Sequence, residues 1–347
     1  MTTSLAAMNL LQYRERYPYD GAALRSMSES EAARQAERLK LPSAGAAALV
    51  ADHLEQQMLD FERELVRDLG SSAGQDLSDV ALLHVLIDSP NAFTLFDQHD
   101  RSYAIGLDPG FWHAICFLYW DAALGQRVND PRWFLVLATK TVGWFWVGSS
   151  KDWTEDADVQ VKTILQTAPD LWSFGRDLVN TAISFSVAHE VGHIVLGHLE
   201  GPHAGSVRLS EEGPASRASA MESMEQERAA DAWAAEALFR WAGDDFKKQT
   251  LVLSVPALCF CLSALKSQMT APATNAIARA TANSHPSDMD RAQRLHTLAG
   301  SHANEVAGSN AMKHFVELGY WVNEQRTLLQ REGMQWVPEW FRSRGLA

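Results

Sequence analysis

The chain has 347 residues, of which 46% are hydrophobic and 21% are charged, as in a globular protein of one or two domains. Its formal net charge of −13 argues against a nucleic-acid partner, because proteins that bind nucleic acids present a basic face. The three cysteines form no CxxC pair, so we expect neither a disulfide framework nor a cysteine zinc site. With no secretory leader evident, the sequence predicts a cytoplasmic protein.

The first 75 residues predict an N-terminal helical region. Its second half repeats large apolar residues at helical spacing with charged residues between them, which is the pattern of an amphipathic helix. Gly70-Ser71-Ser72 is expected to end this helix. We expect the region to pack on a core that spans residues 76–300. The apolar positions are Leu54, Met58, Phe61, Leu65 and Leu69.

Residues 80–110 predict three strands: one within 81–87, one within 90–96, and one within 103–107 after a polar turn. Together they predict a small antiparallel sheet, whose edge an extended peptide can join as an added strand. The aromatic-rich segment that follows, at about 111–160, predicts an insertion. Its aromatic side chains are expected to be core, with a hydrophobic substrate groove as the alternative.

The most informative stretch is His189-Glu190-Val191-Gly192-His193, which lies in an apolar run that predicts a buried helix. Residues four apart share one helix face, so His189 and His193 can aim two imidazoles at one metal ion. Glu190 stands where a carboxylate can act on a water beside that metal. The HExxH pattern is a metallopeptidase signature.

Zinc requires a third protein ligand, and the sequence offers several. His198 is five residues after His193 and points about 140° away on an ideal helix, so we do not expect it to bind the metal. His203, in the polar loop 201–221, has no supporting pattern. Glu227 lies on a second, alanine-rich helix and is the preferred ligand, with Asp231 one turn later as a hydrogen-bond partner of a liganding histidine. Glu225 and Glu222 are the alternatives to Glu227.

Taken together, HExxH at 189–193, Glu227-x-x-Ala230-Asp231 and Ser284-His285-Pro286-Ser287 followed by Arg291 resemble the gluzincin metallopeptidases related to HtpX and the CAAX prenyl protease. The strand Pro90-Asn91-Ala92-Phe93 is also similar to theirs. The resemblance implies zinc on His189, His193 and Glu227, Glu190 as the catalytic base, and His285 and Arg291 near the active site. The HEVGHIVLGH run is also similar to ImmA/IrrE-type peptidases, and a soluble, Lit-like phage-exclusion peptidase is a further relative.

We therefore predict an α+β, mostly α-helical, zincin-like fold with the sheet beside the HExxH helix and a C-terminal helical extension at 301–347. The expected activity is zinc-dependent hydrolysis of peptide bonds in an intracellular protein, with one zinc ion and a protein or peptide as the partner. The alternatives are a non-catalytic, zinc-stabilised protein that binds a partner, and a narrowly specific regulatory or phage-defence protease. The apolar run 251–265 is shorter than the about 20 residues of a spanning helix, so we expect it in the core, although an interfacial segment is the alternative.

Overall fold

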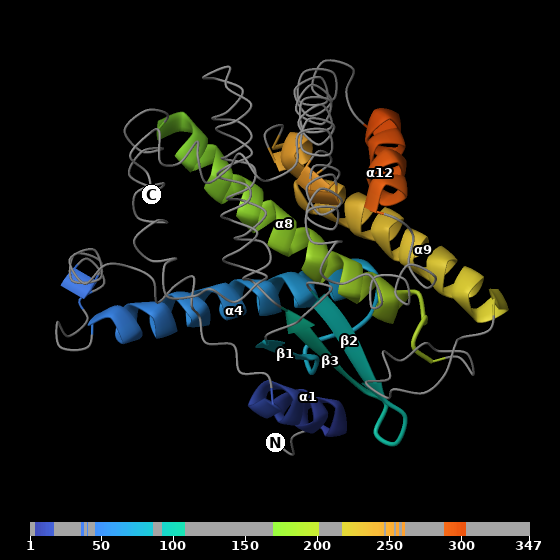
Figure 1. The fold of residues 1–347 in the computed structure, drawn as a ribbon, viewed down its shortest axis with the longest axis horizontal. Helices are drawn as coiled ribbons and strands as arrows, with labels where there is room; N and C mark the ends of the chain where they lie inside the picture. Colours follow the sequence, from blue (N-terminus) through green and yellow to red (C-terminus); the bar gives the residue numbers. More distant parts are fainter. Residues whose placement is uncertain are drawn as a thin grey trace, which may run out of the picture.

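The computed structural model describes residues 4–16, 36–37, 40, 46–85, 92–107, 169–200, 217–245, 248–252, 255–256, 259–260 and 288–302. In these parts, a three-stranded sheet lies between helix α1 (Leu5–Arg16) and the long helices α4 (Ala46–Ser72) and α8 (Pro169–Val195) (Figure 1). Helix α9 (Arg217–Trp241) packs along α8, and α12 (Asp288–His302) packs on α9. The mostly helical α+β class is confirmed.

The sheet contains β1 (Ala81–His84), β2 (Ala92–Asp97) and β3 (Ser102–Leu107) in the order β1-β3-β2. The prediction of an antiparallel sheet is wrong in one respect: β2 and β3 are antiparallel, but β1 pairs with β3 in parallel. The hairpin β2–β3 turns back so that β3 occupies the centre, and β1 then runs in the direction of β3. Both β1 and β2 are left at the edges of this sheet.

The two faces of the sheet are covered by different helices, as the alternation of side chains along a strand requires. On one face, Phe93 and Ala104 form a buried cluster with Ala6 and Leu10 of α1. A Cβ on Gly106, which pairs with Phe93 across the sheet, would lie 2.7 Å from the Phe93 ring, so this position must be glycine for the ring to pack. The opposite face is directed toward α4 and α8.

A buried charged cluster joins that second face to α4. His84 of β1 is fully buried, and its Nε2 lies 2.8 Å from Oε2 of the buried Glu62. Its Nδ1 lies 3.7 Å from Glu55 Oε1, which also accepts a hydrogen bond of 3.2 Å from Arg14 of α1. Because buried charges are costly unless paired, this cluster fixes the sheet between the two N-terminal helices. Within the described part of the first 75 residues, α1 contacts the sheet and α4 contacts α8.

Helix α8 ends at Val195, three residues before His198. Gly197 has φ +69°, and it donates to Ile194 while the His198 amide donates to the His193 carbonyl. These two bonds form a Schellman cap, which depends on a glycine that tolerates the left-handed conformation.

Several predicted segments lie outside the described residues: the aromatic insertion, most of the loop 201–221, and the extension from 303 onward. Residues 251, 252, 255, 256, 259 and 260 are helical and buried, in agreement with a core position for this part of 251–265. Within the described parts of the chain, the structure contains no helix with the length and apolar character needed to cross a membrane.

Candidate metal centre

The metal-binding motif lies near the C-terminal end of α8, in a part of the helix that is surrounded by protein. Val187, Ala188 and Val191 are fully buried, and Ile194 nearly so. His189 and Glu190 are themselves buried, with exposed fractions of 8% and 6%. The apolar residues of this helix are buried on all sides, so its polar side chains must point toward partners, because a buried polar group without a partner is costly.

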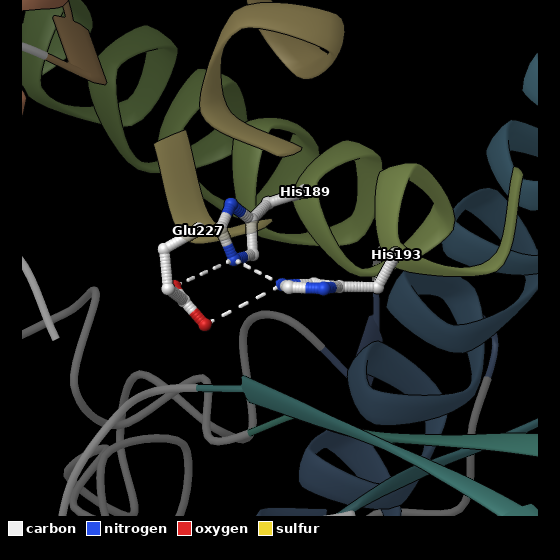
Figure 2. Close-up of side chains that lie close together, drawn as sticks. All are labelled: His189, His193 and Glu227. Carbon is white, nitrogen blue, oxygen red and sulfur yellow. Dashed lines mark hydrogen bonds and ion pairs between the residues drawn. The ribbon is translucent and has the colours of Figure 1, made fainter. Parts of the chain in front are cut away.

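Helix α9 approaches this part of α8 closely because both helices present small residues. A Cβ on Gly192 would lie 3.3 Å from the carbonyl oxygen of Ala230 and 3.2 Å from the Trp233 ring. Ala230, Ala234 and Ala235 are buried in α9. This close contact brings Glu227 of α9 to the imidazoles of α8, as predicted (Figure 2).

The three side chains lie close enough together to bind one metal ion. His189 Nε2 and His193 Nε2 are 3.1 Å apart, and they lie 3.4 Å and 3.5 Å from the two carboxylate oxygens of Glu227 (Figure 2). Atoms bound tetrahedrally to zinc at about 2.0–2.1 Å stand about 3.3–3.4 Å apart. The two imidazole nitrogens are separated by somewhat less than such an edge, and each of them lies 3.4–3.5 Å from a different oxygen of Glu227. Among the residues that the structure describes, this is the one group of acidic, histidine and cysteine side chains with such spacing.

Asp231 lies behind His189, on the side away from Glu227. Its Oδ1 is 2.9 Å from His189 Nδ1. The guanidinium of Arg291, in α12, donates two hydrogen bonds to the same carboxylate, from Nε at 2.8 Å and from Nη2 at 2.6 Å. Burial opposes ionisation of Asp231, but the charges of Arg291 and His189 lower the pKa of its carboxyl group. Arg291 also stacks on Phe260, with its Cζ 4.1 Å from the ring centroid.

The electrostatics of the site favour a cation. Burial opposes the charged form of His189, but Asp231 and Glu227 outweigh it and raise its pKa to about 10. Burial and the charge on His189 lower the pKa of His193 to about 3. The carboxylates of Asp231 and Glu227 thus favour positive charge at the His189 imidazole. A metal ion bound between the same side chains satisfies the same requirement for positive charge.

Glu190 points to the sheet, where it meets a partner that the sequence did not indicate. The hydroxyl of Thr94, in β2, donates a hydrogen bond of 2.6 Å to Glu190 Oε2, and both side chains are buried. Burial raises the pKa of the Glu190 carboxyl group. No local pattern links Thr94 with Glu190, since 96 positions separate them in the chain.

His198 also has a place in the site, because α8 ends abruptly. The Schellman cap turns the chain back, and His198 Nδ1 lies 3.1 Å from His193 Nδ1. That ring nitrogen is the one opposite to Nε2, which faces Glu227, so His198 supports His193 and is not part of the ligand group. The glycine at 197 followed by a histidine was the signal in the sequence for this arrangement.

The structure thus brings His189, Glu190, His193, Glu227, Asp231 and Arg291 into one region. The alternative ligand Glu225 is exposed and pairs with Arg228 at 3.3 Å. His285, His203 and the side chain of Glu222 lie outside the described residues. The residues that sequence reasoning missed are Thr94 and Phe260, and the role of His198 beside His193.

A comparison with protein-family models finds a match to Peptidase U49 over residues 152–311. This segment contains the two histidines, Glu227, Asp231 and Arg291, but not the sheet. Neither the curated proteins nor the solved structures provide a match. The family match and the cluster on α8 and α9 both support a peptidase.

Proposed function

We propose that the protein is a zinc-dependent endopeptidase that hydrolyses peptide bonds in a protein substrate. The observation that carries the proposal is the group formed by His189, His193 and Glu227, which lie close enough together to hold one metal ion. Two imidazoles and one carboxylate are the donor set of several catalytic zinc sites, in which the fourth position is open. The match to a peptidase family supports the same conclusion.

In this proposal, bound zinc supplies Lewis acidity, which acidifies a water and polarises a carbonyl group at neutral pH. Glu190 accepts a proton at its carboxylate and later returns it to the leaving amine. Burial raises the pKa of the Glu190 carboxyl group, which makes its carboxylate a stronger base for accepting the proton.

Asp231 and Arg291 hold the first histidine in place. In the proposal His189 carries its proton on Nδ1, which lies 2.9 Å from Asp231 Oδ1, and this leaves the lone pair of Nε2 for the metal. Arg291 fixes Asp231 through two hydrogen bonds, and Phe260 fixes the plane of the guanidinium. We therefore assign Arg291 to positioning.

The edge strand β2 offers a place for the substrate. Among the described strands it pairs with β3 alone, and it contacts α8. An extended peptide that pairs with this edge would present its carbonyl groups to the site.

The test is Glu190→Gln, measured against His193→Ala. Glu190→Gln is expected to retain one equivalent of zinc and to lose about 100-fold or more of the rate of peptide hydrolysis, since general-base catalysis contributes about that much. His193→Ala is expected to lose the zinc as well. Zinc is measured by atomic absorption after dialysis, and hydrolysis with dye-labelled casein. A Glu190→Gln protein as active as the unaltered chain would contradict the mechanism.

A further inference from the structure

The contact between Thr94 and Glu190 extends the site from the helices to the sheet. The Thr94 hydroxyl donates to Glu190 Oε2 at 2.6 Å, and the exposed fractions of the two residues are 4% and 6%. A hydrogen bond to an ionised, buried carboxylate is stronger than one between neutral groups. Within the described parts of the chain, the other oxygen, Oε1, makes no hydrogen bond and is left to accept a proton.

The register of the sheet determines that Thr94 faces Glu190. Phe93 packs toward α1 and covers Gly106, its partner in β3. Because neighbouring residues of a strand point to opposite faces, Thr94 must point toward α8. A shift of one residue in the pairing would place the Phe93 ring against α8 instead, so the packing of Phe93 maintains the position of the hydroxyl.

A second contact holds the hairpin against α8 at its far end. Arg101 Nη2 lies 2.5 Å from Glu200 Oε2, and the hydroxyl of Tyr103 donates to the other oxygen of Glu200. Glu200 follows the cap of α8, and Tyr103 stacks on Phe96, which shares a face of β2 with Thr94. The turn end of the hairpin is thereby joined to the segment that follows α8. The β-branched side chain of threonine adds a stiff χ1 angle.

We propose that Thr94 is the positioning residue of Glu190: its hydroxyl holds Oε2, so that Oε1 stays directed to the reacting water. This inference rests on the proposed function. It adds a group from the sheet, outside the segment that matches the peptidase family, to the machinery carried by the helices. Thr94 acts through Glu190 and does not itself touch the metal position.

The variants that test this are Thr94→Val, which keeps the shape and removes the hydroxyl, and Thr94→Ser, which keeps the hydroxyl. Thr181→Val is the matched control, because Thr181 of α8 donates only to the backbone carbonyl of Asp177 at 2.7 Å. All variants are loaded with zinc, and the bound zinc is counted first. The readouts are kcat and KM with dye-labelled casein, and the calorimetric affinity for acetohydroxamate, whose proton a correctly placed carboxylate accepts.

Thr94→Val is expected to bind zinc normally and to lose about tenfold in kcat with KM unchanged, which is the scale of a slight misplacement of a catalytic group. It should bind acetohydroxamate more weakly, as Glu190→Gln does, and cause no further loss when combined with Glu190→Gln. Thr94→Ser and Thr181→Val should resemble the unaltered chain.

Two results would overturn the inference: unchanged kcat and acetohydroxamate affinity in Thr94→Val, or an equal loss in Thr94→Ser. If the unaltered chain binds zinc and acetohydroxamate but cleaves no casein, the acetohydroxamate affinities of the variants decide whether Thr94 positions Glu190. If the unaltered chain takes up no zinc, the proposed function itself fails, and the role of Thr94 fails with it. If only the role assigned to Thr94 is wrong, the unaltered chain still binds zinc and acetohydroxamate, and this separates the two failures.

Discussion

Asp231 connects His189 with Arg291, and Asp231→Asn tests how much the metal site and the fold depend on this connection. The substitution keeps the size of the side chain and one acceptor oxygen but removes the charge. It weakens the contact of 2.9 Å with His189 Nδ1 and the two hydrogen bonds from Arg291, which measure 2.8 and 2.6 Å. We expect both weaker zinc binding and a less stable fold.

The two effects have different sizes because they have different causes. Loss of a carboxylate that orients a liganding histidine lowers metal affinity by about 10- to 100-fold, or about 1.4–2.7 kcal/mol. The expected decrease in the free energy of unfolding is larger than this decrease in the free energy of zinc binding. The Asp231 and Arg291 side chains are 6% and 14% exposed, and removal of one partner from a buried ion pair costs about 3–5 kcal/mol. The partial exposure of Arg291 favours the lower end of that range.

The assay titrates zinc into the metal-free protein against a chromophoric chelator, and urea unfolding of the metal-free protein gives the stability. Asp290→Asn is the matched control, since Asp290 is one position before Arg291 on α12 but is 39% exposed and pairs with Arg228 at 3.2 Å. It should change neither quantity by much. If Asp231→Asn bound zinc as tightly as the unaltered chain, Asp231 would not orient His189, and the argument from its position would be refuted.

Two further predictions concern the helix cap and the buried histidine of the sheet. Gly197→Ala, at φ +69°, should destabilise the fold by about 1 kcal/mol and weaken zinc binding through His198, whereas Gly243→Ala, at φ +57° after α9, should cost similar stability with no change in zinc affinity. Equal zinc affinity in both would contradict a role for the cap. Burial opposes a charged His84, but the glutamates of α4 raise its pKa above 6.5. Its contribution to stability is therefore complete below about pH 6.5 and is lost as the pH rises through the folded-state pKa. Urea midpoints should differ more between the unaltered chain and His84→Gln at pH 6 than at pH 9, and a constant difference would exclude this linkage.

The sequence alone determined the parts of the site that depend on local geometry. The four-residue spacing of His189 and His193 places both on one face of a helix, whatever surrounds that helix. The same rule places Glu227 and Asp231 on one face of α9, and small residues such as Gly192 and Ala230 indicated that two helices approach closely. The three strands and the helical N-terminal region could likewise be predicted from periodicity and composition.

Only the tertiary structure decided the contacts between distant elements. The order β1-β3-β2 depends on which strand edges meet, and a strand's own pattern does not specify its neighbours. The abrupt end of α8 at Gly197 brought His198 back to His193, where an ideal helix would have separated them. Arg291 was expected near the site, but its engagement with Asp231 follows from the packing of α12 on α9. Thr94 reaches Glu190 because the Phe93 ring packs on the other face of the sheet, a cause that lies far from either residue in the chain.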